Sequence, residues 1–128
     1  MPMMEWRFWI GTGACTAGLS VLLGAFGAHA LKGTLDDQQI QWFKTAFEYH
    51  AFHSLALLIL GLLASRTNNS LVQSSGWFFC LGIVLFSGSL YLMALGFPKT
   101  LAIITPIGGL SFLTAWTLMA IATFKKIS

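Results

Sequence analysis

The stretch FWIGTGACTAGLSVLLGAFGAHAL, residues 8–31, carries no formally charged side chain over 24 residues and decides the fold. An α-helix rises about 1.5 Å per residue, so a helix of this length crosses a hydrocarbon core of about 30 Å with some tilt. The whole chain of 128 residues is 56% hydrophobic and only 9% charged. Soluble domains carry about 25% charged residues, so lipid is the solvent that this composition predicts for most of the surface.

Three further apolar segments follow the first one, and short polar stretches separate them. Thr34 and Asp37 have the spacing of a capping box at the start of the second segment. Trp42 and Trp77 are typical of residues that anchor a helix at the lipid interface. The sequence therefore predicts an all-α membrane protein, a four-transmembrane-helix bundle with short loops. It forms a single domain, residues 1–128, with helices at approximately 7–31, 35–64, 77–97 and 101–124.

Apart from the adjacent Lys125 and Lys126, basic residues are scattered singly along the chain rather than clustered on one face. This excludes a nucleic-acid partner and leaves the lipid bilayer as the expected partner. Four spans place both termini on one side of the membrane. Cytoplasmic loops carry an excess of Lys and Arg, so a small excess on that side predicts cytoplasmic termini. The residues on the side of the termini are Arg7, Arg66, Lys125 and Lys126, and those on the other side are Lys32, Lys44 and Lys99.

Small residues recur at three- and four-residue spacing in the first and fourth segments, which is the pattern that lets helices approach closely in lipid. Either the bundle itself or a partner protein can occupy such faces, and the sequence leaves both interpretations open. We accordingly expect a homo-oligomer or a larger membrane complex as the assembly. The residues expected to pack helices are Gly13, Ala17, Ser20, Gly24, Gly27, Gly108 and Gly109.

Polar side chains from all four segments converge in one leaflet of the expected bundle, because the first and third helices end where the second and fourth begin. The candidate ligand cluster is His29, His50, His53, Tyr91, Ser89 and Thr105. One interpretation is structural, with hydrogen bonds that hold the helices together. The other is functional: His29, His50 and His53 are then candidates to bind a metal or haem, or to transfer a proton or small solute. The spacing is not the H-E-x-x-H of zinc proteases.

Glu48 is an acidic residue inside the second apolar segment, and two interpretations of it stay open. Lys44 lies one helical turn earlier, so the two side chains have the spacing of an ion pair near the membrane interface. The second interpretation is an intramembrane carboxylate that faces a neighbouring helix or subunit.

Four motifs in order resemble one known family over nearly the whole chain: GAFGAHALK at 24–32, TAFEYHAFHSLAL at 45–57, LFSGSLY at 85–91 and TPIGG at 105–109. Together they resemble the YgdD-like membrane proteins, domain-of-unknown-function family 423, with relatives in the transmembrane protein 256 group. The resemblance implies a four-helix protein, typically of the bacterial inner membrane, and no enzyme activity follows from it. The three histidines match histidines of the family's motifs, whereas Ala30 stands where many relatives have Gly.

No complete catalytic motif is present, since the serines lack a recognisable base and no nucleotide-binding loop occurs. We therefore expect a non-enzyme without a cofactor. The first hypothesis is a structural or accessory component that self-associates or joins a larger membrane complex. The second is a membrane protein that binds a small ligand, proton, metal or haem through the intramembrane histidines.

Overall fold

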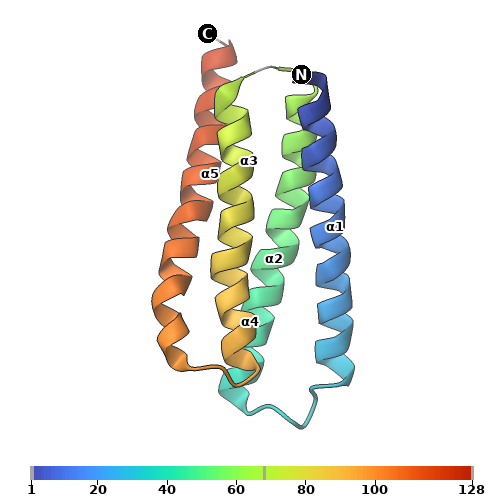
Figure 1. Ribbon diagram of the computed structural model, residues 1–128, viewed down its shortest axis with the longest axis vertical. Coiled ribbons are helices and arrows are strands. Elements are labelled where there is room, and N and C mark those ends of the chain that lie inside the picture. The colour runs from blue at the N-terminus through green and yellow to red at the C-terminus, as the bar shows by residue number, and fades with distance from the viewer. Residues whose placement is uncertain (1, 68, 128) are drawn as a thin grey trace.

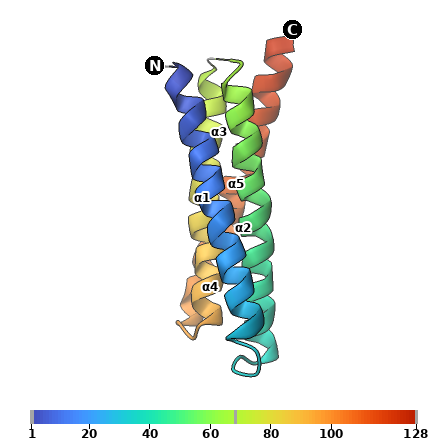
Figure 2. The ribbon, with the colours of Figure 1, turned by 90° about the vertical axis from the view of Figure 1, so that its right-hand side faces the viewer.

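The computed structural model describes residues 2–67 and 69–127, and within these ranges the chain is almost wholly helical. Four long rods run side by side along the longest axis of the molecule (Figure 1). Both termini lie at one end, and the loops after the first and third rods lie at the other end, as Figures 1 and 2 both show. The elements are α1 (Pro2–His29), α2 (Asp37–Ala64), α3 (Ser70–Gly82), the π-helical turn η1 (Ile83–Ser87), α4 (Gly88–Ala94), the 3-10 helix η2 (Lys99–Ile103) and α5 (Ile104–Ile127).

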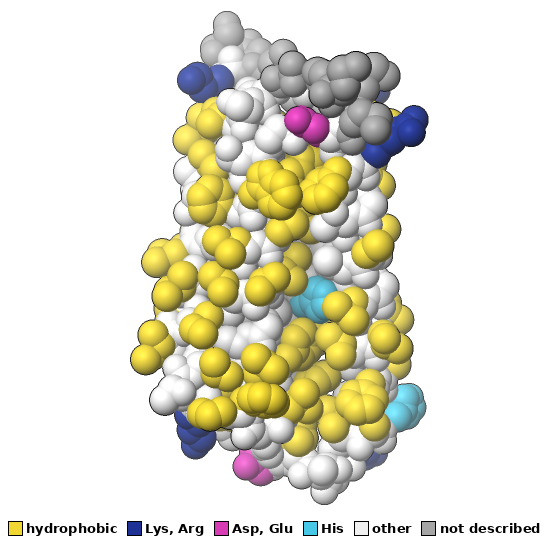
Figure 3. Space-filling view, in the orientation of Figure 1, with side chains coloured by type: hydrophobic (Ala, Val, Ile, Leu, Met, Phe, Trp, Pro, Cys, Tyr) yellow, Lys and Arg dark blue, Asp and Glu magenta, His cyan; other side chains and the backbone are white. Residues whose placement is uncertain are grey.

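Four helical stretches are long and apolar enough to cross a membrane, which confirms the expected fold class. They are Glu5–His29, Asp37–Ala64, Ser70–Ala94 and Lys99–Lys125. Figure 3 shows the matching surface, with charged side chains at the two ends and hydrophobic side chains over the middle. The second of these rods, α2, supplies the centre of the bundle, and its buried residues include Ala46, Leu57 and Leu60.

The helices pack in a chain of neighbours rather than in a closed ring. α1 packs on α2, α2 packs on the rod formed by α3, η1 and α4, and that rod packs on α5. Figure 1 shows α1 and α5 on opposite sides of the molecule. α2 and α5 touch through large side chains such as His53 and Phe112 instead of by close backbone approach. Wide lateral openings between helices follow from this arrangement.

Several helix ends differ from the sequence prediction. α2 begins at Asp37 rather than at residue 35, and its capping box is formed by Asp36 and Gln39, not by Thr34 and Asp37. Asp36 accepts from the backbone N–H of Gln39 at 2.8 Å, and its own N–H donates back to the Gln39 side chain at 3.0 Å. α1 ends at His29, so Leu31 belongs to the loop.

The third rod begins at Ser70, seven residues before the predicted start at Trp77. The polar side chains of this extension, which lies before the predicted span, bond within the protein. Gln73 accepts from the indole N–H of Trp9 at 2.7 Å. Ser75 donates to the carbonyl of Ala115 at 2.7 Å. Because these polar groups are satisfied internally, the helix continues through them inside a membrane protein.

Candidate functional site

His53 is buried, and both of its ring nitrogens are occupied. Its Nδ1 lies 2.8 Å from the carbonyl oxygen of Tyr49, and a carbonyl only accepts, so this nitrogen carries the hydrogen. Its Nε2 lies 3.1 Å from the indole nitrogen of Trp116, which only donates. The ring also stacks on Phe112 with centroids 3.6 Å apart. His53 is therefore held as one neutral tautomer between α2 and α5.

His50 is also buried, but it faces a different neighbour. Its Nδ1 lies 2.9 Å from the hydroxyl of Tyr91 on α4, across the bundle from the His53 contacts. Its Nε2 is buried and makes no hydrogen bond of ordinary geometry among the described residues, although the main chain of Thr16 in α1 lies close enough to interact with the ring. A buried polar atom without a good hydrogen bond costs about 1–3 kcal/mol, so this nitrogen lowers the stability of the core.

The remaining members of the predicted cluster are only partly brought together. Ser89 and Thr105 join α4 to α5 through a hydroxyl contact of 2.5 Å, and Ser89 also donates to the carbonyl of Phe86. His29 is exposed at the end of α1. No hydrogen bond or ring contact joins it to His50 or His53 in the described part of the chain. Within residues 2–67 and 69–127, no group of three His, Cys, Asp or Glu is placed to hold a metal ion.

Two sets of contacts in this region were not predicted from the sequence. Trp116 lies in the middle of α5, and an indole N–H in a membrane span needs an acceptor, which was the available signal. The second is the set of serine bonds between helices. Ser87 donates to the carbonyl of Ala46 at 2.8 Å, and Ser111 donates to that of Phe78 at 2.7 Å.

The small-residue face of α1 is used inside the bundle. A Cβ added at Gly13 would lie 3.0 Å from the backbone nitrogen of Leu58, and one at Gly24 would lie 2.7 Å from the ring of Phe47. Gly27 approaches the Phe43 ring in the same way. These glycines let α2 lie directly against α1. Further along the same face Ala17 is half-buried, and Ser20 is buried with its hydroxyl donating to the carbonyl of Ala17.

In α5, Gly108 is the close contact and Gly109 is not. A Cβ at Gly108 would meet the main chain of Phe86, whereas one at Gly109 would lie 3.8 Å from the Phe86 ring, an ordinary distance. The predicted packing residues thus serve contacts within one chain. None of these approaches requires a partner protein.

A groove of about 860 Å³ opens between α2 and α5. Aromatic side chains form most of its wall, among them Tyr49, Phe86 and Trp116. Glu48 also lines it, and this side chain is exposed. No ion pair joins Glu48 to Lys44 in the described chain, so the pair that the sequence spacing suggested is not formed. The groove therefore contains a carboxylate that has no ion-pair partner among the described residues.

The four long apolar helices place this chain in the class of small integral membrane proteins. The family model described as "Protein of unknown function (DUF423)" matches residues 23–109, and the chain belongs to this family.

Relatives align along nearly their whole length. The UPF0382 membrane protein SH2409 of Staphylococcus haemolyticus is 43% identical over 94% of this chain and 98% of its own. YwdK of Bacillus subtilis is 40% identical, covering 94% and 99%. The UPF0382 inner membrane protein YgdD of Escherichia coli K12 is 42% identical, covering 95% and 93%. No solved structure matches the chain.

Proposed function

We propose that the protein is a non-enzymatic accessory component of the membrane that self-associates through the exposed face of α2. The observation that carries this proposal is Glu48, an exposed carboxylate within a membrane span that has no ion pair among the described residues. The hydroxyls of Ser75, Ser87 and Ser111 all donate to main-chain carbonyls, which supports a non-enzymatic role because none is held by a base.

The depth of Glu48 makes a partner necessary. It lies eleven residues after Asp37, about 17 Å along α2 at 1.5 Å per residue. If a helix of 28 residues is centred on a core of about 30 Å, Glu48 lies about 10 Å inside the hydrocarbon. A charge at the centre of a span costs about 2.5–3.5 kcal/mol, and such groups are generally paired.

The exposed face of α2 is suited to a second copy of the same chain. Its exposed residues recur at spacings of four and three, the periodicity of a helix–helix seam: Lys44, Glu48, Phe52, Leu55, Ile59 and Leu62. In a symmetric dimer the same patch meets itself, so every contact occurs twice. Lys44 of one copy then lies beside Glu48 of the other, and the reverse pair forms as well. A single interface thus gives the Glu48 carboxylate of each copy a lysine partner.

A charge-exchange experiment tests this pairing between chains. Glu48→Lys leaves two basic residues in the patch, and Lys44→Glu leaves two acidic ones, so each variant alone should dimerise more weakly. Polar contacts in membranes are worth about 0.6–2 kcal/mol, which is a loss of about 3- to 30-fold per pair. A mixture of the two variants carrying different tags should form mixed dimers in lipid nanodiscs. Only a pair formed between chains restores association in the mixture.

Cysteine cross-linking supplies a matched control. In a Cys15→Ser and Cys80→Ser background, Leu55→Cys at the centre of the patch should cross-link two copies. Leu22→Cys, which is equally exposed to lipid on α1, should not. Wild-type protein that is monomeric in nanodiscs contradicts the proposal. So does a Leu55→Cys variant that, in its native membrane, cross-links only to a different protein, which favours a larger complex instead.

We also propose the inner membrane as its location, with both termini in the cytoplasm. The printed name of the Escherichia coli relative supports the first part. Arg7, Arg66 and Lys125 near the end that bears the termini support the second. Lys126, counted in the same group, has a side chain outside the described residues. A C-terminal green fluorescent protein fusion should fluoresce, and a C-terminal alkaline phosphatase fusion should be inactive. The opposite pair of results contradicts this orientation.

A further inference from the structure

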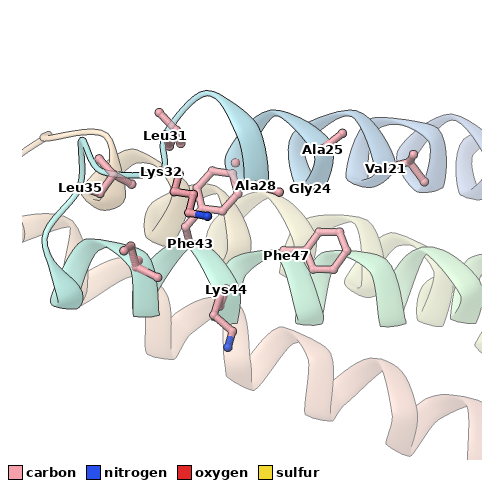
Figure 4. A pocket seen from close by; sticks show the side chains of 12 residues that line it. Val21, Gly24, Ala25, Ala28, Leu31, Lys32, Leu35, Phe43, Lys44 and Phe47 are labelled. Carbon is pink, nitrogen blue, oxygen red and sulfur yellow. The ribbon is translucent and has the colours of Figure 1, made fainter.

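A second lateral cleft lies between α1 and α2, near the loop that joins them. Its volume is about 640 Å³, and its lining is apolar except near the loop. Figure 4 shows the two walls: small residues of α1 such as Gly24 and Ala28 lie opposite Phe43 and Phe47 of α2. Ligand sites typically enclose about 300–1,000 Å³, so the cleft has the size of a site for a small molecule or part of a lipid.

The local sequence explains why this space is left open. Gly24 and Gly27 bring the rings of Phe47 and Phe43 against the backbone of α1, where a Cβ would collide with them. The rings form the floor of the cleft. Beyond them, Ala25 and Ala28 are exposed and carry too little side chain to fill the gap. The cleft is therefore a consequence of small residues on one helix and flat aromatic residues on the other.

The charges of the cleft are arranged along its length. Lys32, just after the end of α1, extends its ammonium group between the helices in Figure 4, close to Phe43. Lys44 lines the cleft from α2, but in that view its ammonium group points away from α1. No acidic residue lines the cleft. Asp36, the nearby acid of the loop, accepts from the backbone of Gln39 as the cap of α2.

We propose that this cleft binds one acyl chain of an anionic phospholipid, with Lys32 beside the lipid phosphate. A phospholipid has its charge at the membrane surface and its chain toward the centre. The cleft repeats this order, with Lys32 at the loop and Gly24 and Val21 deeper along α1. A free anion would leave the apolar part empty, and a neutral lipid would leave Lys32 without a counter-charge. This inference does not depend on self-association through α2.

Lipid competition tests the proposal. The protein, purified in mild detergent, is mixed with equal amounts of phosphatidylglycerol and phosphatidylethanolamine, and bound lipid is measured by native mass spectrometry. A basic residue near a membrane surface contributes about 1 kcal/mol toward anionic lipid, which is about fivefold in binding. Lys32→Gln should therefore lower the preference for phosphatidylglycerol about fivefold. Lys99→Gln is the control, because Lys99 is at the same end of the molecule, lies over Trp42 and does not line the cleft.

A second pair of variants tests the position of the acyl chain. Ala28→Leu fills the cleft and should abolish lipid retention, whereas Ala14→Leu, on an exposed part of α1 outside the cleft, should not. Equal binding of the two lipids by wild type, unchanged preference in Lys32→Gln, or unchanged retention in Ala28→Leu would each overturn the proposal. The Glu48→Lys variant, which should dimerise more weakly, should keep its lipid, so failure of self-association and failure of lipid binding are separable.

Discussion

The sharpest test of the helix packing is a comparison of two adjacent glycines, Gly108 and Gly109, near the start of α5. A Cβ at Gly108 would contact the backbone nitrogen of Phe86 and lie 2.8 Å from its Cα, whereas a Cβ at Gly109 would lie 3.8 Å from the ring. Phe86 belongs to the π-helical turn η1, and its main chain moves only if the two helices separate. Alanine at either site gains the same helix propensity, up to about 1 kcal/mol.

The expected difference follows from the close contact alone. Overpacking a well-packed core costs about 1–3 kcal/mol, so Gly108→Ala should unfold more easily than Gly109→Ala by about that amount. The assay is unfolding in mixed micelles titrated with sodium dodecyl sulfate, followed by far-ultraviolet circular dichroism. If both variants unfold at the same detergent fraction, α5 does not lie against the backbone of η1, and the described packing is refuted.

Three further substitutions test individual hydrogen bonds with the same unfolding assay. Trp116→Phe removes the donor to His53 Nε2 and should lower the free energy of unfolding by about 1–3 kcal/mol. Trp77→Phe should lower it less, because no hydrogen bond is recorded for the Trp77 side chain among the described residues. Equal losses in the two variants would contradict the assigned bond. Tyr91→Phe alone should destabilise because it removes the hydroxyl bonded to Nδ1 of the buried His50 ring. Tyr91→Phe combined with His50→Phe should recover much of that loss, since the imidazole is then removed as well; simple additivity of the two changes would count against the pair. Ser87→Ala should cost about 0.5–1.5 kcal/mol through the lost bond to Ala46, and a neutral result would show that this bond does not join η1 to α2.

The number and order of the helices could be predicted from the sequence because charge-free stretches such as 8–31 have only one stable solution in lipid. The start of α3 could not be predicted in this way. Residues 70–76 are polar enough to resemble a loop, and only the structure shows that Gln73 and Ser75 bond to α1 and α5. Polarity is a poor guide to a helix end when the partners lie far away in the sequence.

The histidine region shows a second limit. Residues three apart on a helix lie about 60° apart around its axis, which is near enough to suggest one site and far enough to face two neighbours. His50 faces Tyr91 of α4 and His53 faces Trp116 of α5. Likewise, the spacing of Gly13, Gly24 and Gly27 predicts a packing face but not its partner, which proves to be α2. The identity of neighbouring helices is the information that a single sequence lacks.

Four helices cross the membrane in this fold, with the loops after α1 and α4 on one side and the start of α3 on the other. Single cysteines at Thr34, Thr100 and Ser70, all exposed positions, test it in a chain without Cys15 and Cys80. A membrane-impermeant maleimide added to oriented vesicles should label Thr34→Cys and Thr100→Cys together from one side and Ser70→Cys only from the other. Labelling of Ser70→Cys from the same side as Thr34→Cys would contradict this four-span topology.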